Sequence, residues 1–344
     1  MTPPDAPTVP TLAPDATDRA LRSGAVVRWW QTTMFVEVVG PDAVTLIEGM
    51  CTQAVERMRV GTTEPGLFLD VKARIIAPVL VHRDEIATWH DAKRDAVVEG
   101  PVPRVLLETL PDLIEPLVAH LSRYRLRARC DIHAAQLGAI AVVGANAANH
   151  ELPGIDTHRF IAAHAPIPTV TYVGALDTLS GLVAALTPAF GLAEPSAFEA
   201  HRIDAGVPSL HDLIPGRMPA EVGGVDHAVA LDAGCYLGQE PVVRLHFRGR
   251  ANRTLRRLSA DAPVVLGAPV ADDPDAIFAL RRCDDSSDAR PVGRLTTWAE
   301  RPDGTTAALA ILRREIGVAT ALQLPETTTS LIVVDAAPTP AEAR

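Results

Sequence analysis

One short stretch of the chain, residues 234–240, gathers several chemically active side chains. It reads Gly-Cys-Tyr-Leu-Gly-Gln-Glu, so a thiol, a phenol, an amide and a carboxylate fall within six consecutive positions. Glycine permits backbone angles and close approaches that other residues resist, so this segment can present side chains and backbone N–H groups to a ligand. Pro241 follows, and proline suits the first turn of a helix. We therefore expect a loop that carries Cys235 and a short helix that begins near Glu240.

Cys235 itself allows two interpretations. A thiol close to a helix N-terminus has its thiolate stabilised by the helix dipole, which would make it a functional thiol. A buried cysteine in a tight turn is the alternative, and the local sequence alone favours that interpretation.

A basic run follows the expected helix. Arginine binds carboxylates through a two-pronged contact, so this run is a candidate for holding an acidic ligand in a chain whose net charge is −10. Arg244 is the first candidate because it lies nearest the Cys235 stretch, and the remaining arginines fit a solvated face or an anion or partner patch. The six arginines, with no acidic residue among them, are Arg244, Arg248, Arg250, Arg253, Arg256 and Arg257.

The sequence contains no motif for a metal site or for nucleotide chemistry. The eleven histidines are scattered without an H-E-x-x-H pair, so no metal site is predicted. The chain also has no Walker loop, no Rossmann glycine fingerprint and no G-x-S-x-G elbow. The sequence therefore does not predict nucleotide hydrolysis or hydride transfer.

Composition limits the partners and the compartment. Only 4% of the 344 residues are aromatic and the net charge is −10, so direct nucleic-acid binding is not expected. The longest apolar stretches are too short to span a bilayer, so no membrane contact is expected either. Four widely separated cysteines without a C-x-x-C pair favour a reduced, cytoplasmic protein. They are Cys51, Cys130, Cys235 and Cys283.

Local patterns predict the elements that position these residues. Residues 67–81 are expected to form a hairpin, and alternation over 123–130 predicts a strand with one basic face. Residues 102–120 are expected to contain helical stretches, and residues 197–205 a helix.

The chain is expected to have an α+β body followed by an all-β domain. Short strands punctuated by Gly, Pro and Asp from about residue 255 onward indicate a small barrel. A start rich in Pro, Thr, Ala and Asp, without the basic and apolar parts of a signal peptide, predicts a disordered leader. The expected domains are a leader over 1–23, a body over 24–254 with two subdomains, a barrel over 255–330 and a flexible tail over 331–344.

The Cys235 stretch resembles a family motif. Residues 233–240 resemble the K-G-C-Y-x-G-Q-E motif of the YgfZ-type folate-binding proteins, relatives of the glycine-cleavage T-protein (GcvT), with Ala233 in place of the lysine. Residues 202–208 resemble the family's R-x-E-A-G-I-P, with Asp204 in place of the glutamate, and residues 219–221 resemble its P-x-E. Further matches, in the family's order from about residue 25 to about residue 320, are Val39-Gly40-Pro41-Asp42-Ala43, Cys51-Thr52-Gln53 and Val292-Gly293-Arg294-Leu295-Thr296.

The resemblance implies a fold and a cofactor. The fold is a GcvT/YgfZ-like body with ferredoxin-like β-α-β units, followed by a small C-terminal β-barrel. The cofactor is reduced folate, tetrahydrofolate, with or without a polyglutamate tail. In GcvT relatives the R-x-E glutamate accepts adjacent N–H groups from the pterin edge, and Asp204 occupies that position. The alternative is that Asp204 pairs with Arg202 or caps a helix end. The implied folate-binding candidates are Arg202, Asp204, Glu221, Tyr236, Gln239, Glu240 and Arg244, with Cys235 as the functional thiol.

A departure from the T-protein pattern bears on function. Ala77 and Pro78 fall where the T-protein has the aspartates that activate folate, and neither can move a proton. The resemblance therefore implies a folate-binding accessory protein, without glycine-cleavage activity, for iron–sulfur cluster enzymes or their assembly factors, including enzymes that modify tRNA. A tetrahydrofolate-dependent one-carbon transferase is the alternative, which would make the chain an enzyme, and an adaptor with a vestigial folate cleft is a third.

Overall fold

The computed structural model describes residues 9–30, 34–149, 157–162, 165–223, 228–248, 251–266, 278–286 and 289–335. Contacts divide the chain into two compact units. The first unit consists of Met1–Leu12, Arg19–Ala193 and His227–Pro241, and the second of Ala13–Asp18, Glu194–Asp226 and Val242–Arg344.

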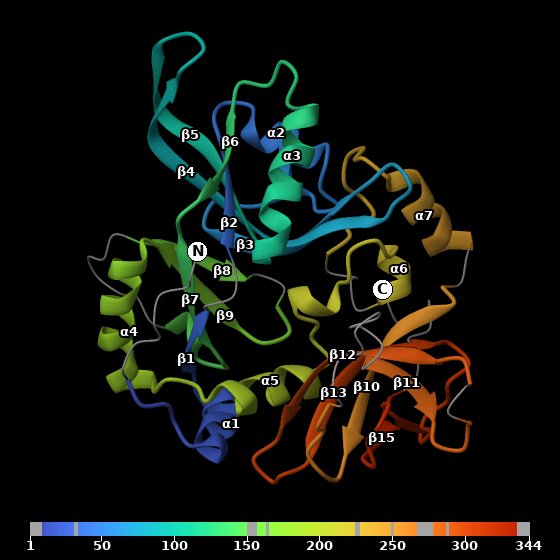
Figure 1. Cartoon of the computed structure of the whole chain (residues 1–344). Helices are drawn as coiled ribbons and strands as arrows, with labels where there is room; N and C mark the ends of the chain where they lie inside the picture. Colours follow the sequence, from blue (N-terminus) through green and yellow to red (C-terminus); the bar gives the residue numbers. More distant parts are fainter. Residues whose placement is uncertain are drawn as a thin grey trace. The chain divides into compact units, whose positions relative to one another are not determined.

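A mixed sheet forms the centre of the first unit (Figure 1). Among the described residues it has nine strands in the order β1-β7-β9-β8-β3-β4-β5-β2-β6, paired antiparallel except for the parallel pair β3 and β8. The strands are β1 Val26–Trp30, β2 Met34–Val39, β3 Thr62–Leu69, β4 Ile75–Asp91, β5 Ala96–Thr109, β6 Asp131–Ala135, β7 Gly138–Val143, β8 His158–Ala162 and β9 Thr169–Gly174.

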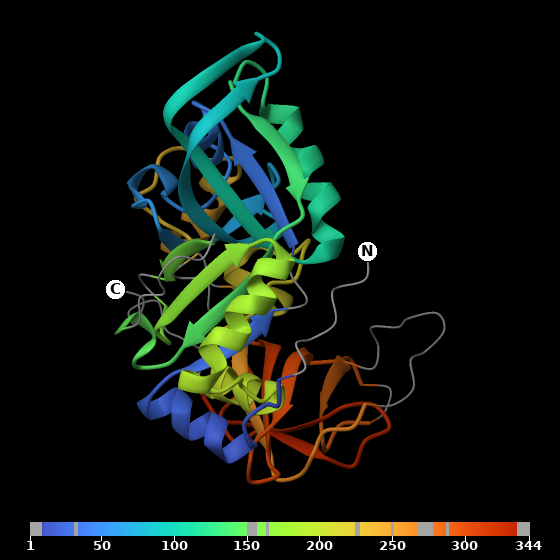
Figure 2. The same cartoon turned by 90° about the vertical axis from the view of Figure 1, so that its left-hand side faces the viewer.

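Helices cover one side of each half of this sheet (Figures 1 and 2). Helices α2 (Ala43–Glu48) and α3 (Ile114–Tyr124) bury Ile47 and Leu117 against apolar side chains of β2, β4 and β5. Helix α4 (Leu176–Phe190) buries its leucines against β1, β7 and β9. Alternating side chains of a strand point to opposite faces, and Phe35 of β2, Leu106 of β5 and Phe160 of β8 belong to a second buried cluster.

That second face of the sheet holds a buried polar row. His82 on β4 lies between Thr63, whose Oγ1 is 2.7 Å from Nδ1, and Glu108, whose Oε2 is 3.1 Å from Nε2. All three residues are buried. A fully hydrogen-bonded network of this kind specifies how strands β3, β4 and β5 align, because an unpaired member would be costly.

The second unit is built around a closed barrel, drawn in orange and red in Figure 1. Its described strands run in the order β10-β13-β12-β11-β14-β15 around a core that includes Leu258, Leu295, Leu312 and Leu331. Helix α5 (Pro195–Asp204) packs on β12 and β13, and α6 (Pro219–Val222) on β10. The strands are β10 Arg253–Ala260, β11 Ala279–Arg282, β12 Gly293–Glu300, β13 Thr306–Arg313, β14 Ala321–Gln323 and β15 Ser330–Val333.

The α+β fold with a C-terminal barrel is confirmed, as are the hairpin between β3 and β4 and helix α5. Two local predictions are corrected by the structure. The helical stretches expected over 102–120 are found from Ile114 onward, in α3, but residues 102–109 belong to strand β5 and are buried on both faces there, so they lack the alternation of an exposed strand. Over 123–130, the helix α3 ends at Tyr124 and the arginines then lie in a connection, where the backbone N–H of Arg129 donates to Asp42 at 2.7 Å.

The domain bounds stay a prediction, although the structure divides the chain differently. Helix α1 (Pro14–Ser23) lies where a disordered leader is expected, and α5 and α6 belong to the barrel unit rather than to the body. Strand β15 extends past residue 330 into the expected tail, and residues 1–8 and 336–344 lie outside the described residues. No helix in the described part of the chain is long and apolar enough to cross a membrane.

Candidate functional site

Cys235 lies in an exposed loop of the first unit. Residues 228–238, called here the Cys235 loop, contain neither helix nor strand, and α7 (Gln239–Arg248) begins directly after them. The helix starts one residue before the expected Glu240. The thiol of Cys235 is exposed, whereas those of Cys51 and Cys130 are buried.

The segment that follows α2 anchors this loop. The N–H of Ala230 donates to the carbonyl of Thr52 at 2.9 Å, and the Thr52 hydroxyl donates to the carbonyl of Ala228. Further along, the N–H of Leu237 donates to the Gly49 carbonyl at 3.2 Å, and the N–H of Gly234 donates to Glu48 Oε1 at 3.3 Å. Most of these contacts hold the loop through its backbone, which leaves the side chains of Cys235 and Tyr236 for other contacts.

Gly238 explains the second glycine of the motif. Its φ is +83°, and a Cβ at this position would lie 2.6 Å from the carbonyl oxygen of Asp70 in the β3–β4 hairpin. Only glycine meets both conditions without strain. The motif thus places the end of the Cys235 loop directly against that hairpin.

Tyr236 gives the loop a hydroxyl group that is available for a hydrogen bond. The residue is 5% exposed, and within the described part of the chain its buried hydroxyl has no hydrogen-bonding partner. Burial raises the pKa of Tyr236 to about 12, and the nearby Cys51 contributes to the increase. The phenol is therefore a protonated donor, and leaving such a buried group unpaired costs roughly 1–3 kcal/mol. An unpaired group of this kind calls for an explanation such as a ligand.

The other candidates of the motif lie at the start of α7. Gln239 closes the loop, because its Nε2 donates to the carbonyl of Gly234 at 3.3 Å. Glu240 and Arg244 are exposed. Both are accessible to a ligand, and neither is held in a fixed contact within the described residues.

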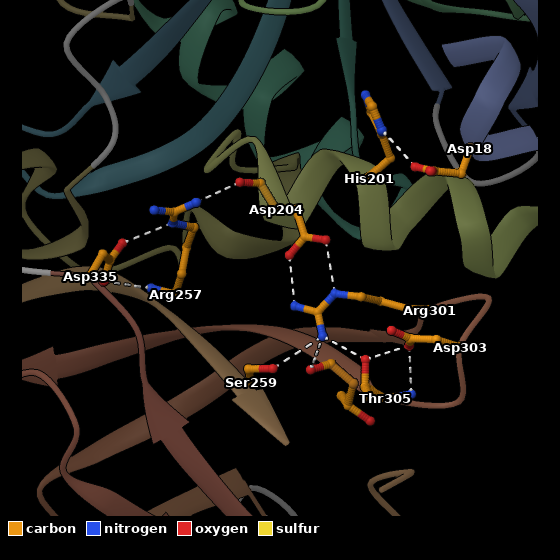
Figure 3. Close-up of polar contacts among 10 residues, drawn as sticks. Asp18, His201, Asp204, Arg257, Ser259, Arg301, Asp303, Thr305 and Asp335 are labelled. Atoms are coloured by element: carbon orange, nitrogen blue, oxygen red, sulfur yellow. Dashed lines mark hydrogen bonds and ion pairs between the residues drawn. The ribbon is translucent and has the colours of Figure 1, made fainter. Parts of the chain in front are cut away.

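The motif over residues 202–208, called here the α5 motif, lies in the second unit and is differently arranged. Asp204, the last residue of α5, accepts two hydrogen bonds from Arg301: Nε to Oδ2 at 2.9 Å and Nη2 to Oδ1 at 2.7 Å (Figure 3). The pKa of Arg301 is raised above its usual value, mainly by these hydrogen bonds to Asp204. Of the two interpretations of Asp204, the structure shows an ion pair, with Arg301 as its partner in place of the expected Arg202.

Arg202 and Glu221 are also engaged within the second unit. Arg202 is buried and its Nη1 lies 3.2 Å from the carboxylate of Asp212, which is fully buried. It also donates to Glu199 and to the carbonyl of Val207. The carboxylate of Glu221 accepts the N–H of Met218 at 3.1 Å, which caps the start of α6.

The arginines of the basic run have separate environments. Arg256 and Arg257 both pair with Asp335, at 3.1 Å each. Arg253 lies opposite Arg313 in the barrel, and its pKa is lowered by burial and then by neighbouring arginines. Arg250 lies outside the described residues, and for Arg248 only the backbone is described.

The structure adds residues that the sequence did not single out. Arg301 lies 97 positions from Asp204, and Asp212 receives hydrogen bonds from Thr296 and Thr297 on β12. Sequence spacing gives no signal for contacts between an α5 residue and a distant barrel turn. Ala77 and Pro78, by contrast, are found inside strand β4, and both are buried.

Comparisons with known proteins give relatives and a fold. No family model matches the chain. It is 26% identical over 237 residues to "Iron-sulfur cluster assembly factor IBA57 homolog, mitochondrial" of Mycosarcoma maydis, covering 65% of this chain and 54% of the relative. The homologue of the same name in Coccidioides immitis (strain RS) is 27% identical over 233 residues, with 62% and 52% covered. The chain thus spans about half the length of the curated relatives it matches.

A solved structure gives the fold. The glycine cleavage system aminomethyltransferase T from Bartonella henselae superposes with a TM-score of 0.67 at 16% identity, covering 93% of this chain and 87% of that one. The chain therefore has the GcvT-type fold, and the resemblance found in its sequence is confirmed. The expectation of a cytoplasmic location is wrong by this comparison, because the relatives are named as mitochondrial proteins.

Proposed function

We propose that this protein binds tetrahydrofolate and acts as an accessory factor in the assembly or maintenance of iron–sulfur cluster enzymes, without glycine-cleavage activity. The observation that carries the proposal is sequence similarity to three iron–sulfur cluster assembly factors, each over more than 230 residues. The GcvT-type fold supports the folate part, since it is shared with an aminomethyltransferase. Iron–sulfur enzymes that modify tRNA are one proposed group of clients.

The proposed folate contacts divide by chemistry. The Tyr236 hydroxyl can donate to a carbonyl or ring nitrogen of the ligand, and Gln239 and Glu240 lie beside it in the chain. Arg244 is the proposed partner of the carboxylates of the glutamate tail. Its guanidinium is exposed and can bind a carboxylate of a flexible tail through two hydrogen bonds.

Asp204 is the residue proposed to contact the pterin, and Arg202 and Glu221 are further proposed folate-binding residues. A carboxylate matches the adjacent N–H donors of the pterin edge. Both oxygens of Asp204 already accept hydrogen bonds from Arg301, so this carboxylate does not fit the pterin while that ion pair is intact.

Aminomethyl transfer is disfavoured by the buried pair Ala77 and Pro78. Neither side chain carries a proton that could be exchanged, and both are buried in β4. The one-carbon transferase therefore remains the weaker alternative. It is tested by incubating the protein with an aminomethylated lipoyl carrier and tetrahydrofolate. We expect neither ammonia nor methylenetetrahydrofolate above background, and clear turnover would favour the transferase.

The accessory function is tested in cells that lack the gene for this protein. The readout is the activity of iron–sulfur enzymes after complementation. We expect the parent and a Cys283→Ala variant to restore activity and a Cys235→Ala variant to fail, with equal protein levels by immunoblot. Cys283 is the matched control, because its thiol is exposed like that of Cys235 but lies in the barrel. Full restoration by Cys235→Ala would remove the thiol from the proposed function, and failure of the parent would reject the function itself.

A further inference from the structure

Arg301 is held firmly in the second unit by more than its contact with Asp204. Its Nη1 donates to Ser259 Oγ at 3.1 Å, to Thr305 Oγ1 at 3.0 Å and to the carbonyl of Thr306 at 2.8 Å (Figure 3). The turn that carries these groups is itself fixed, because Asp303 accepts from the N–H and the hydroxyl of Thr305. The Nε and Nη2 donors of the guanidinium are thus presented in a fixed direction, toward the end of α5.

The guanidinium of Arg301 makes the same contact with Asp204 that a pterin would make. It offers two coplanar N–H groups, and the two carboxylate oxygens accept one each. The pyrimidine edge of a pterin also offers two adjacent N–H groups to a carboxylate. Both partners need the same two lone pairs facing the same way, so Asp204 can pair with only one of them at a time.

We propose that Arg301 is an internal competitor of the ligand for Asp204 and that this residue sets the affinity of the protein for reduced folate. The proposal rests on the proposed function, in which Asp204 reads the pterin edge. Arg301 then acts on ligand binding through Asp204, without touching the ligand.

The geometry indicates which side of the pair moves. Arg301 keeps three oxygen partners when Asp204 leaves, and its side chain is 20% exposed, against 39% for Asp204. The backbone of Asp204 is fixed separately, because Arg257 Nη1 donates to its carbonyl at 2.6 Å. A rotation of the Asp204 side chain is therefore enough to exchange one partner for the other.

The experiment is calorimetric titration of the full chain with tetrahydrofolate. Arg301→Met removes the competing donors, and we expect it to bind about tenfold more tightly than the parent, the value of a charged hydrogen-bonded contact. Arg301→Lys keeps the charge but cannot form the two-pronged contact, so about a threefold gain is expected. This second variant also decides the question if Arg301→Met does not fold, as judged by circular dichroism.

Two further variants show whether the gain passes through Asp204. In the double variant Arg301→Met/Asp204→Asn the gain should disappear, because an amide cannot accept both N–H groups. Arg257→Met is the matched control: it removes a neighbouring cation that contacts the backbone of Asp204 and not its carboxylate. We expect its affinity to stay within about twofold of the parent.

The outcomes separate this inference from the function on which it rests. If the parent binds tetrahydrofolate and neither Arg301 variant binds more tightly, Arg301 is not a competitor and the proposed function stands. A gain that survives Asp204→Asn, or that Arg257→Met reproduces, also overturns the inference. If the parent and every variant fail to bind, the folate function is rejected and the inference falls with it.

Discussion

The Cys235 loop and the α5 motif are the two regions that carry the family resemblance, and they differ in how their polar groups are satisfied. In the loop, backbone hydrogen bonds hold the chain while the Cys235 thiol is exposed and the buried Tyr236 hydroxyl has no partner among the described residues. In the α5 motif, Arg202 and Asp204 are both paired with residues of the same unit.

This difference shows that two motifs that resemble the same family in sequence can serve different ends. A region with open polar groups is prepared for a ligand, since binding would remove the cost of an unpaired group. In a region whose charged groups already form ion pairs, those pairs hold the local elements together. A ligand that binds there must compete with the ion pairs. The predictions below test each side of the contrast, beginning with the largest expected effect.

Breaking the buried pair of the α5 motif should cost the most. Asp212→Ala leaves Arg202 buried without its fully buried partner, and we expect the free energy of unfolding to fall by about 3 kcal/mol or more in urea titrations. The control is Arg57→Gln, which removes an exposed ion pair with Asp232 of the Cys235 loop and should cost less than about 1 kcal/mol. Equal losses for the two variants would contradict the contrast between the regions.

The buried thiol next to Tyr236 predicts a pH dependence of stability. Burial raises the pKa of Cys51 from 9.0 to about 12, so above pH 9 the unfolded chain releases a proton that the folded chain retains. Stability should therefore fall as pH rises, by about 1.4 kcal/mol per pH unit for this group. Urea unfolding between pH 8 and 11 should give a shallower slope for Cys51→Ala, even if that variant is less stable throughout. Identical slopes would show that Cys51 does not retain its proton.

Alkylation rates give a smaller but more local test of the Cys235 loop. Under limited iodoacetamide treatment, mass spectrometry should find label on the exposed Cys235 and Cys283 before the buried Cys51 and Cys130, whose pKa values burial raises to about 12 and about 11. We expect Cys235 to react first, because its exposed thiol lies in a loop, whereas the Sγ of Cys283 lies 3.5 Å from the hydroxyl of Ser330. Protection of Cys235 while the others react would make it a packing residue.

How much the sequence could predict depended on the range of the contacts involved. The barrel, the hairpin and the loop before α7 follow from local patterns and glycine positions, and the structure confirms them. Residues 102–109 of β5 do not show the pattern of a strand, because their burial on both faces removes the alternation that identifies one. The partner of Asp204, Arg301, lies in the turn after β12, and Arg202 also reaches Thr297 on β12; no local pattern specifies contacts over that separation.

The central claim is that this protein binds reduced folate, and calorimetric titration of the parent chain tests it most directly. Tetrahydrofolate and its polyglutamates are the ligands, and a γ-linked glutamate oligomer without the pterin is the control. We predict saturable binding of both folates to one site per chain and none of the control. No saturable heat with either folate, from protein that circular dichroism shows to be folded, would contradict the account.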